Sequence, residues 1–117
     1  MEEIQVGEYV RTKYGKIRKL ISTLAQYYIL EKINIEERNQ YELEDIASHS
    51  FNIIDLIEVE DYVNGDKIID VGGAWKDNLE TVTIIEGETM GEITEIDIKS
   101  IVTKEQFSDI EYKVGEE

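Results

Sequence analysis

The sequence predicts an all-β protein of two tandem units, each a small antiparallel barrel of the Src-homology-three-like kind with at most short helical turns. One observation is an internal repeat, because the Val-Gly-Glu-Tyr-Val of residues 6–10 returns as Val-Glu-Asp-Tyr-Val at residues 59–63. Another is that short runs of β-branched and aromatic residues alternate with glycine-containing turns. Closing such strands into barrels would remove sheet edges that otherwise pair with other chains.

The chain length of 117 residues fits one domain or two very small ones. A unit of about 58 residues buries only about 60% of the surface of its unfolded chain, so two such units are expected to share an interface. We divide the chain into a first unit at residues 1–58 and a second at residues 59–117. The sequence has no cysteine, which excludes disulfides and thiolate metal sites, and no run of about 18 apolar residues that would span a membrane.

Negative charge is concentrated in the second unit. The whole chain carries a net charge of −15, of which residues 1–58 contribute −4 and residues 59–117 contribute −11. The exception is a basic hairpin at residues 11–19, which holds Arg11, Lys13, Lys16, Arg18 and Lys19. We expect this hairpin to pair with the acidic unit, either within the chain or between two chains of a homodimer.

In the first unit, residues 4–12 and 16–23 are predicted to form two strands joined by a turn at Tyr14-Gly15, because glycine supplies the positive φ of a tight hairpin. Residues 20–33 fit either a helix or a strand, and we favour a strand because of the Tyr-Tyr-Ile-Leu run at residues 27–30. The remaining segments are predicted in chain order as a loop at 34–40, a short strand at 41–43, a turn or single helical turn at 45–52 and an apolar strand at 53–59.

In the second unit, Asn64-Gly65 is the strongest hairpin signal, since both central residues of a type I′ turn need positive φ. We place Trp75 in an exposed loop, because glycines and polar residues flank it. Thr103 is predicted to cap a helical turn, with Gln106 completing a capping box. The strands of this unit are predicted at 61–63, 67–71, 81–85, 96–102 and 110–114, with a turn at 86–91.

Three segments carry a resemblance: a Val-Gly-Glu-Tyr-Val-Arg-Thr opening at residues 6–12, a centre at residues 50–65 and a Thr-Lys-Glu-Gln-Phe turn at residues 103–107. In these the chain resembles small acidic proteins of phages and prophages of Gram-positive bacteria, although Glu60 stands where those proteins commonly have Gly. The resemblance implies an accessory phage protein in the cytoplasm of an infected or lysogenic host. Some such proteins disable host defences, as anti-CRISPR proteins do.

No catalytic, cofactor or metal site is predicted. His49 is the single histidine and lies between two serines, but a nucleophilic serine needs a base across the fold and an orienting acid, so we interpret His49 as a turn residue. The carboxylate clusters lack calcium-loop spacing. Direct nucleic-acid binding is not expected, because a net charge of −15 repels phosphate despite the basic hairpin.

The acids of the second unit suggest a function. Alternation along strands would place several of them on one solvent face, which could occupy the basic groove of a nucleic-acid-binding enzyme of the host, such as an RNA-guided nuclease. The chain would then be a non-enzymatic inhibitor. The alternative is a protein-interaction or phage structural module whose charge serves only solubility. The candidate partner-binding residues are Asp61, Asp66, Asp70, Asp77, Glu80, Glu86, Glu88, Glu92, Glu95 and Asp97, with Trp75, Tyr62 and Met90 as apolar anchors.

Overall fold

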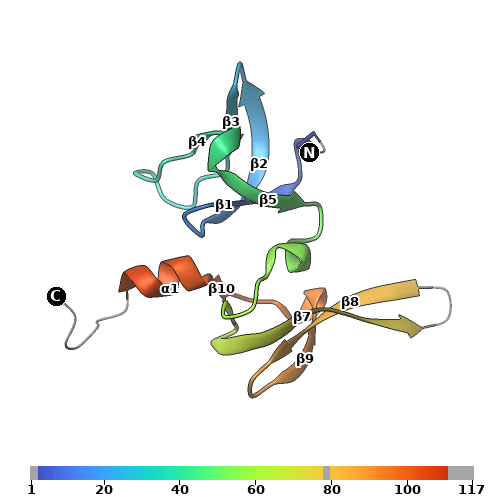
Figure 1. Cartoon of the computed structure of the whole chain (residues 1–117). Helices are drawn as coiled ribbons and strands as arrows, with labels where there is room; N and C mark the ends of the chain where they lie inside the picture. Colours follow the sequence, from blue (N-terminus) through green and yellow to red (C-terminus); the bar gives the residue numbers. More distant parts are fainter. Residues whose placement is uncertain (1–2, 78–79, 111–117) are drawn as a thin grey trace.

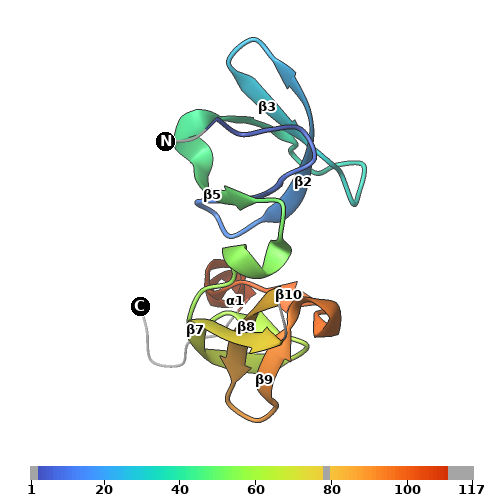
Figure 2. The same cartoon turned by 90° about the vertical axis from the view of Figure 1, so that its right-hand side faces the viewer.

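The computed structural model describes residues 3–77 and 80–110. These residues hold two five-stranded antiparallel sheets and one α-helix (Figure 1). The all-β prediction is therefore confirmed. The 3-10 helix η2 (Ile53–Leu56) lies between the two sheets and links them, as Figure 2 shows.

The first sheet is formed by the chain before η2. Its strand order is β4-β3-β2-β1-β5. The strands are β1 (Tyr9–Thr12), β2 (Ile17–Leu24), β3 (Tyr27–Leu30), β4 (Gln40–Glu42) and β5 (Ile46–Ser50), with the 3-10 helix η1 (Leu43–Asp45) between the last two. The strand interpretation of residues 20–33 is confirmed, because β2 and β3 form a hairpin there.

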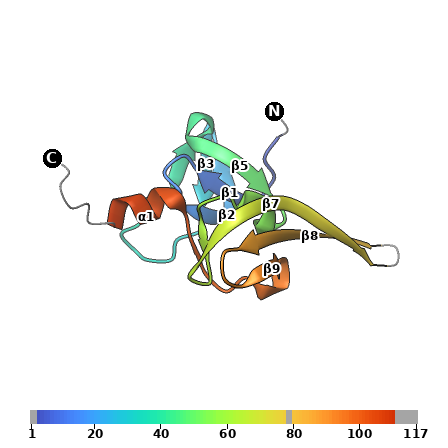
Figure 3. The same cartoon turned by 60° about the horizontal axis from the view of Figure 1, so that its bottom comes forward.

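The second sheet repeats this order as β9-β8-β7-β6-β10. Its strands are β6 (Tyr62–Val63), β7 (Asp66–Asp77), β8 (Glu80–Gly87), β9 (Gly91–Thr94) and β10 (Ile101–Val102). The 3-10 helix η3 (Glu95–Asp97) again precedes the last strand, and the helix α1 (Lys104–Ile110) follows it. β7 and β8 are longer than their counterparts and project from the sheet as a hairpin (Figures 1 and 3).

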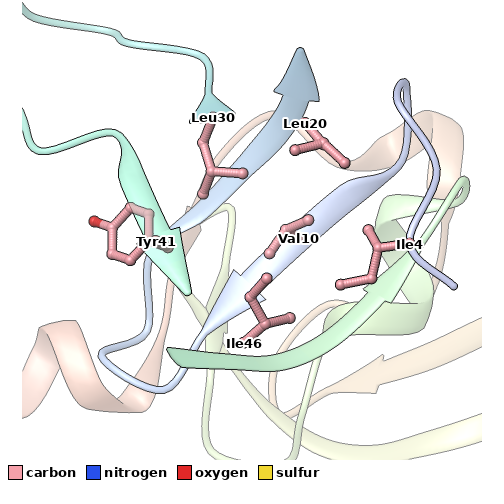
Figure 4. Close-up of a cluster of buried hydrophobic side chains, with 6 residues drawn as sticks. All are labelled: Ile4, Val10, Leu20, Leu30, Tyr41 and Ile46. Atoms are coloured by element: carbon pink, nitrogen blue, oxygen red, sulfur yellow. The ribbon is translucent and has the colours of Figure 1, made fainter. Parts of the chain in front are cut away.

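Each sheet packs around its own core. Ile4, Val10, Leu20, Leu30, Tyr41 and Ile46 form the first, and Figure 4 shows their side chains pointing toward one another. The second core is formed by Ile54, Ile57, Val63, Ile68, Ile85 and Ile93. Alternation accounts for part of this choice: in β8, for example, the buried Ile85 and Gly87 flank the exposed Glu86.

The sequence repeat corresponds to a repeated turn in front of β1 and β6. Gly7 and Glu60 both adopt positive φ, at 100° and 81°. The acids that follow them, Glu8 and Asp61, are both buried, and each accepts the backbone N–H three residues earlier. Glu60 tolerates this conformation without being glycine, so the departure from the phage pattern leaves the turn intact.

Several predicted segments are corrected. Residues 45–52, predicted as a turn or single helical turn, contain the end of η1 and the strand β5, and residues 53–59 contain η2 rather than a strand. Residues 96–102 were predicted as a strand, but only residues 101–102 are extended in a sheet and Ile96 lies in η3, 85% exposed. The predicted loop around Trp75 is part of β7. The closing strand at 110–114 falls mainly on residues outside those described.

Candidate functional site

Three carboxylates form a row across three neighbouring strands of the second sheet. Asp70 of β7 lies opposite Glu86 of β8, and Glu86 lies opposite Glu92 of β9. Directly opposite residues of an antiparallel pair share a face, so the three side chains stand side by side, and all three are exposed. Like charges in such positions are unfavourable, by about 0.2–1 kcal/mol a pair. We call these residues the acidic row.

Trp75 lies beside the acidic row. Its indole N–H donates to Oε2 of Glu92 at 3.2 Å, and its side chain is 44% exposed. A groove of about 160 Å³ runs along the row, with Gly73 and Ile84 also in its wall. A Cβ on Gly73 would stand 2.9 Å from Cγ1 of Ile84, so glycine allows this close approach. The face therefore combines negative charge with an aromatic and an aliphatic surface.

Two predicted partner-binding acids are buried and belong to the fold instead. Asp61 is fully buried. Asp66 is 8% exposed and accepts the backbone N–H groups of Thr89 and Met90, which lower its pKa below its ordinary value. Neither carboxylate is therefore available to a partner. The alternation of residues along a strand predicts which side chains share a face, but not which acids accept hydrogen bonds from a turn.

The other predicted partner-binding residues do not lie together on one face. Glu80 and Glu88 are exposed, whereas Glu95 accepts the backbone N–H of Ile54. Asp97 caps η3 through Thr94, whose backbone N–H lowers the pKa of Asp97. Tyr62 stacks on Phe107 with ring centroids 4.6 Å apart, Met90 is 52% exposed, and the side chain of Asp77 lies outside the described part of the chain.

Most of the basic hairpin is paired within the first unit. Lys13 pairs with Asp45 at 3.2 Å, and Lys16 and Arg18 pair with Glu37 at 3.0 and 2.5 Å. The ammonium group of Lys19 lies 5.5 Å from the ring centroid of Tyr9. The hairpin is therefore not an open cationic surface.

Arg11 is the exception, because it joins the two units. Its side chain is 1% exposed and donates two hydrogen bonds to the carboxylate of Asp61, at 2.5 and 3.0 Å. It also donates to Glu105 at 2.7 Å and to the carbonyl of Leu56 at 2.9 Å. The expectation that the hairpin pairs with the acidic unit within the chain is confirmed for this residue. Burial of Arg11 has no signal in the sequence, since its partner lies 50 residues away.

His49 lies in β5 rather than in a turn, and its Nδ1 is 2.8 Å from Oε1 of Glu8. Burial raises the pKa of Glu8, but the N–H of Gln5 and the contact with His49 outweigh burial and lower it. Within residues 3–77 and 80–110, no three His, Cys, Asp or Glu side chains are grouped so that they could hold a metal ion. No helix in these ranges is long and apolar enough to cross a bilayer.

Comparison with known protein families, with curated proteins and with solved structures finds no match to this chain. The resemblance to phage proteins therefore stays a prediction. What the chain itself offers is the acidic row with Trp75. Sequence reasoning included these four residues but missed Gly73, which was assigned to a loop, and Ile84, whose place beside the row depends on the pairing of β7 with β8.

Proposed function

We propose that the protein is a non-enzymatic inhibitor that binds a basic partner on the face formed by the acidic row and Trp75. The observation that carries this proposal is the row itself: three exposed carboxylates on adjacent strands, kept together although their mutual repulsion disfavours folding. A surface that costs stability and has no role in the core is typical of a site retained for binding.

The spacing of the row suits a surface that normally contacts nucleic acid. Neighbouring strands lie about 4.8 Å apart, so the row presents a charge at about that interval. A single DNA strand presents one charge per about 3.4 Å of helix axis. A basic groove built for phosphates would therefore meet a similar charge density, and the net charge of −15 would speed the encounter. The partner in this proposal is a nucleic-acid-binding enzyme of a bacterial host, such as an RNA-guided nuclease.

We also propose that each sheet is a Src-homology-three-like barrel. The two sheets share one order of five strands, and in both a 3-10 helix precedes the last strand. That arrangement is what the tandem-barrel interpretation requires, and it leaves the long β7–β8 hairpin as the distinctive addition of the second unit. A phage origin and action in the host cytoplasm complete the proposal, on the resemblance alone.

A protein-interaction module is the second candidate, favoured by the 44% exposure of Trp75 beside the partly buried Ile84. An exposed tryptophan on a rigid strand can anchor an interface through apolar contact. In that case the acids contribute solubility and the partner need not be basic.

The test uses two triple variants that each remove three negative charges. One is D70N/E86Q/E92Q, in the acidic row; the control is E3Q/E36Q/E44Q, in exposed acids of the first unit. Partners are captured from a bacterial lysate, purified, and titrated with each variant at about 0.1 and 0.5 M salt. We expect to capture a nucleic-acid-binding enzyme that binds the wild type and the control variant but has lower affinity for the row variant. The wild-type protein and nucleic acid should compete for this enzyme.

Equal affinity for the two variants would contradict the proposal. Loss of binding in Trp75→Ala, combined with retention at high salt and no competition by nucleic acid, would establish the interaction module in its place. The row variant should be at least as stable as the wild type, since it relieves repulsion, so a loss of affinity would not reflect unfolding.

A further inference from the structure

A second feature, separate from the acidic row, is a cavity between the two sheets. Its volume is about 430 Å³, which falls in the range of about 300–1,000 Å³ occupied by small-molecule sites. The first unit contributes Tyr9 and Ile17, η2 contributes Ile53, and the segment between η3 and α1 contributes Ile98 and Ile101. We call it the junction cavity.

Hydrogen bonds hold the walls of the junction cavity, both within the second core and across to the first sheet. The hydroxyl of Thr103 donates to the carbonyl of Gly15 at 2.7 Å and is buried. The backbone N–H of Ile54 donates to Oε2 of Glu95 at 3.2 Å. Together with the Arg11–Asp61 pair, these contacts fix both sides before any ligand arrives, which lowers the entropic cost of binding.

The lining is apolar on one side and polar on the other. Four isoleucines and the ring of Tyr9 offer an apolar surface, whereas Lys99, Ser100 and Gln106 offer hydrogen-bond donors. Glu95 also lines the cavity, but one of its oxygens already accepts the N–H of Ile54. A ligand that fills this space needs an apolar body and a polar end.

Charge decides which polar end fits. Arg11, Lys13, Lys16, Arg18, Arg38 and Lys104 all have a carboxylate within 4 Å. In the described ranges Lys99 and Lys19 form no ion pair; Lys99 lines the cavity and Lys19 lies over the ring of Tyr9. Lys99 thus brings an ammonium group that forms no ion pair to the wall of the cavity, although it also contributes to the lowered pKa of the nearby Asp97.

We propose that the junction cavity binds a small molecule with an apolar body and a single carboxylate. The isoleucines and Tyr9 would cover the body, and Lys99 would contact the carboxylate, with Gln106 as a further donor. This site is independent of the acidic face, so each proposal can fail without the other.

The probe is 4-phenylbutyrate, with the uncharged 4-phenyl-1-butanol as its matched analogue, each titrated into the full-length protein and followed by amide chemical shifts. We expect saturable shifts at Ile17, Ile98 and Ile101, and tighter binding of the carboxylate than of the alcohol. Lys99→Glu should lower the affinity for the carboxylate by about three- to fivefold, since one exposed ion pair contributes about 0.2–1 kcal/mol. It should leave the affinity for the alcohol unchanged.

Lys32→Glu is the matched control, because it makes the same charge change at an exposed position that does not line the cavity. It should leave both affinities unchanged. Shifts that do not saturate, shifts elsewhere on the protein, or equal losses in the two variants would overturn the proposal. Ile98→Trp, which fills the cavity from a partly exposed position, should abolish the shifts of both probes if they bind there.

Discussion

At the scale of single residues, Arg11 is the most consequential side chain. A buried guanidinium is costly unless hydrogen bonds and opposite charges compensate for its lost hydration. Burial lowers its pKa, but Asp61, Glu105 and Glu58 outweigh burial and raise it. Arg11 therefore stays charged, and the two units are joined by a buried ion pair.

Asp61→Asn should lower the free energy of unfolding by about 3–5 kcal/mol, because it leaves a buried charge partly uncompensated. Asp70→Asn, at an exposed position, should not destabilise the protein. Urea unfolding measures both. The double variant R11M/D61N should recover part of the loss, since it leaves no buried charge without a partner and keeps an amide oxygen that can accept the backbone N–H of Glu58. A cost below about 1 kcal/mol for Asp61→Asn would show that the pair is not buried in solution.

The ionisation of Glu37 makes the stability of the protein depend on pH in the acid range. Burial raises its pKa, but the N–H of Ile33, then Lys16 and Arg18, outweigh burial and lower the pKa to about 2. A free glutamate titrates near about 4.3, so this stabilisation is complete above that pH and is lost as the pH falls toward 2. Glu37→Gln should therefore flatten the fall of unfolding free energy between about pH 5 and pH 2. The exposed Glu36→Gln should retain the wild-type slope, and identical slopes in all three proteins would contradict the assignment.

At the scale of elements, the β1–β2 turn is shaped by the helix that packs on it. Gly15 has a φ of 89° and is buried against the start of α1, where its carbonyl accepts the hydroxyl of Thr103. A Cβ there would stand 2.7 Å from Cβ of Glu105. The hairpin and the helix therefore fit together only if this residue has no side chain.

Gly15→Ala should cost at least about 2 kcal/mol more than Gly65→Ala. Both positions have positive φ, at 89° and 81°, so both alanines are strained by about 1 kcal/mol. A Cβ on Gly65 meets no described atom within 4 Å, whereas one on Gly15 forces α1 away from the hairpin. Equal unfolding free energies for the two variants would mean that α1 does not pack against this turn.

The elements also show how far sequence alone could lead. The hairpin at Asn64-Gly65 and the capping box of Thr103 and Gln106 were predicted correctly. Both depend only on residues that are close together in the sequence. The prediction of a strand at the apolar residues 53–59 was wrong, since periodicity cannot distinguish a short buried helix from a strand. Within it Ile54 and Ile57 reach the second core from a 3-10 turn. The sequence predicted the three acids of the row as site residues, but it predicted Asp61 and Asp66 as well. Only the register of β7, β8 and β9 shows that the three acids lie together on one face.

At the scale of the whole molecule, the chain is more extended than a single compact domain. Its radius of gyration is 15.6 Å, against about 13 Å expected for a compact chain of this length. Two cores of six residues each explain the difference. Neither core is large, so the contacts at the junction matter for the stability of both.

The protein should therefore unfold in a single transition. Trp75 is the only tryptophan, so its fluorescence reports on the second sheet, while the amide signals of Val10 and Leu20 report on the first. Urea curves from the two probes should coincide, because unfolding either unit exposes the ion pair of Arg11. Asp61→Asn should separate them. Separate midpoints in the wild type would show that the units are thermodynamically independent.

The repeated buried acid also bears on how the chain folds as it is made. Glu8 meets His49 within the first fifty residues, so the first sheet can be completed with its own side chains. Asp61 instead needs Arg11, and Arg11 needs Glu105. Because synthesis proceeds from the N-terminus, Arg11 leaves the ribosome long before its partners and stays hydrated while the second sheet is translated. The junction is thus the last part of the molecule to form, and a nascent chain that stops before Asp61 carries a first sheet whose guanidinium still faces water.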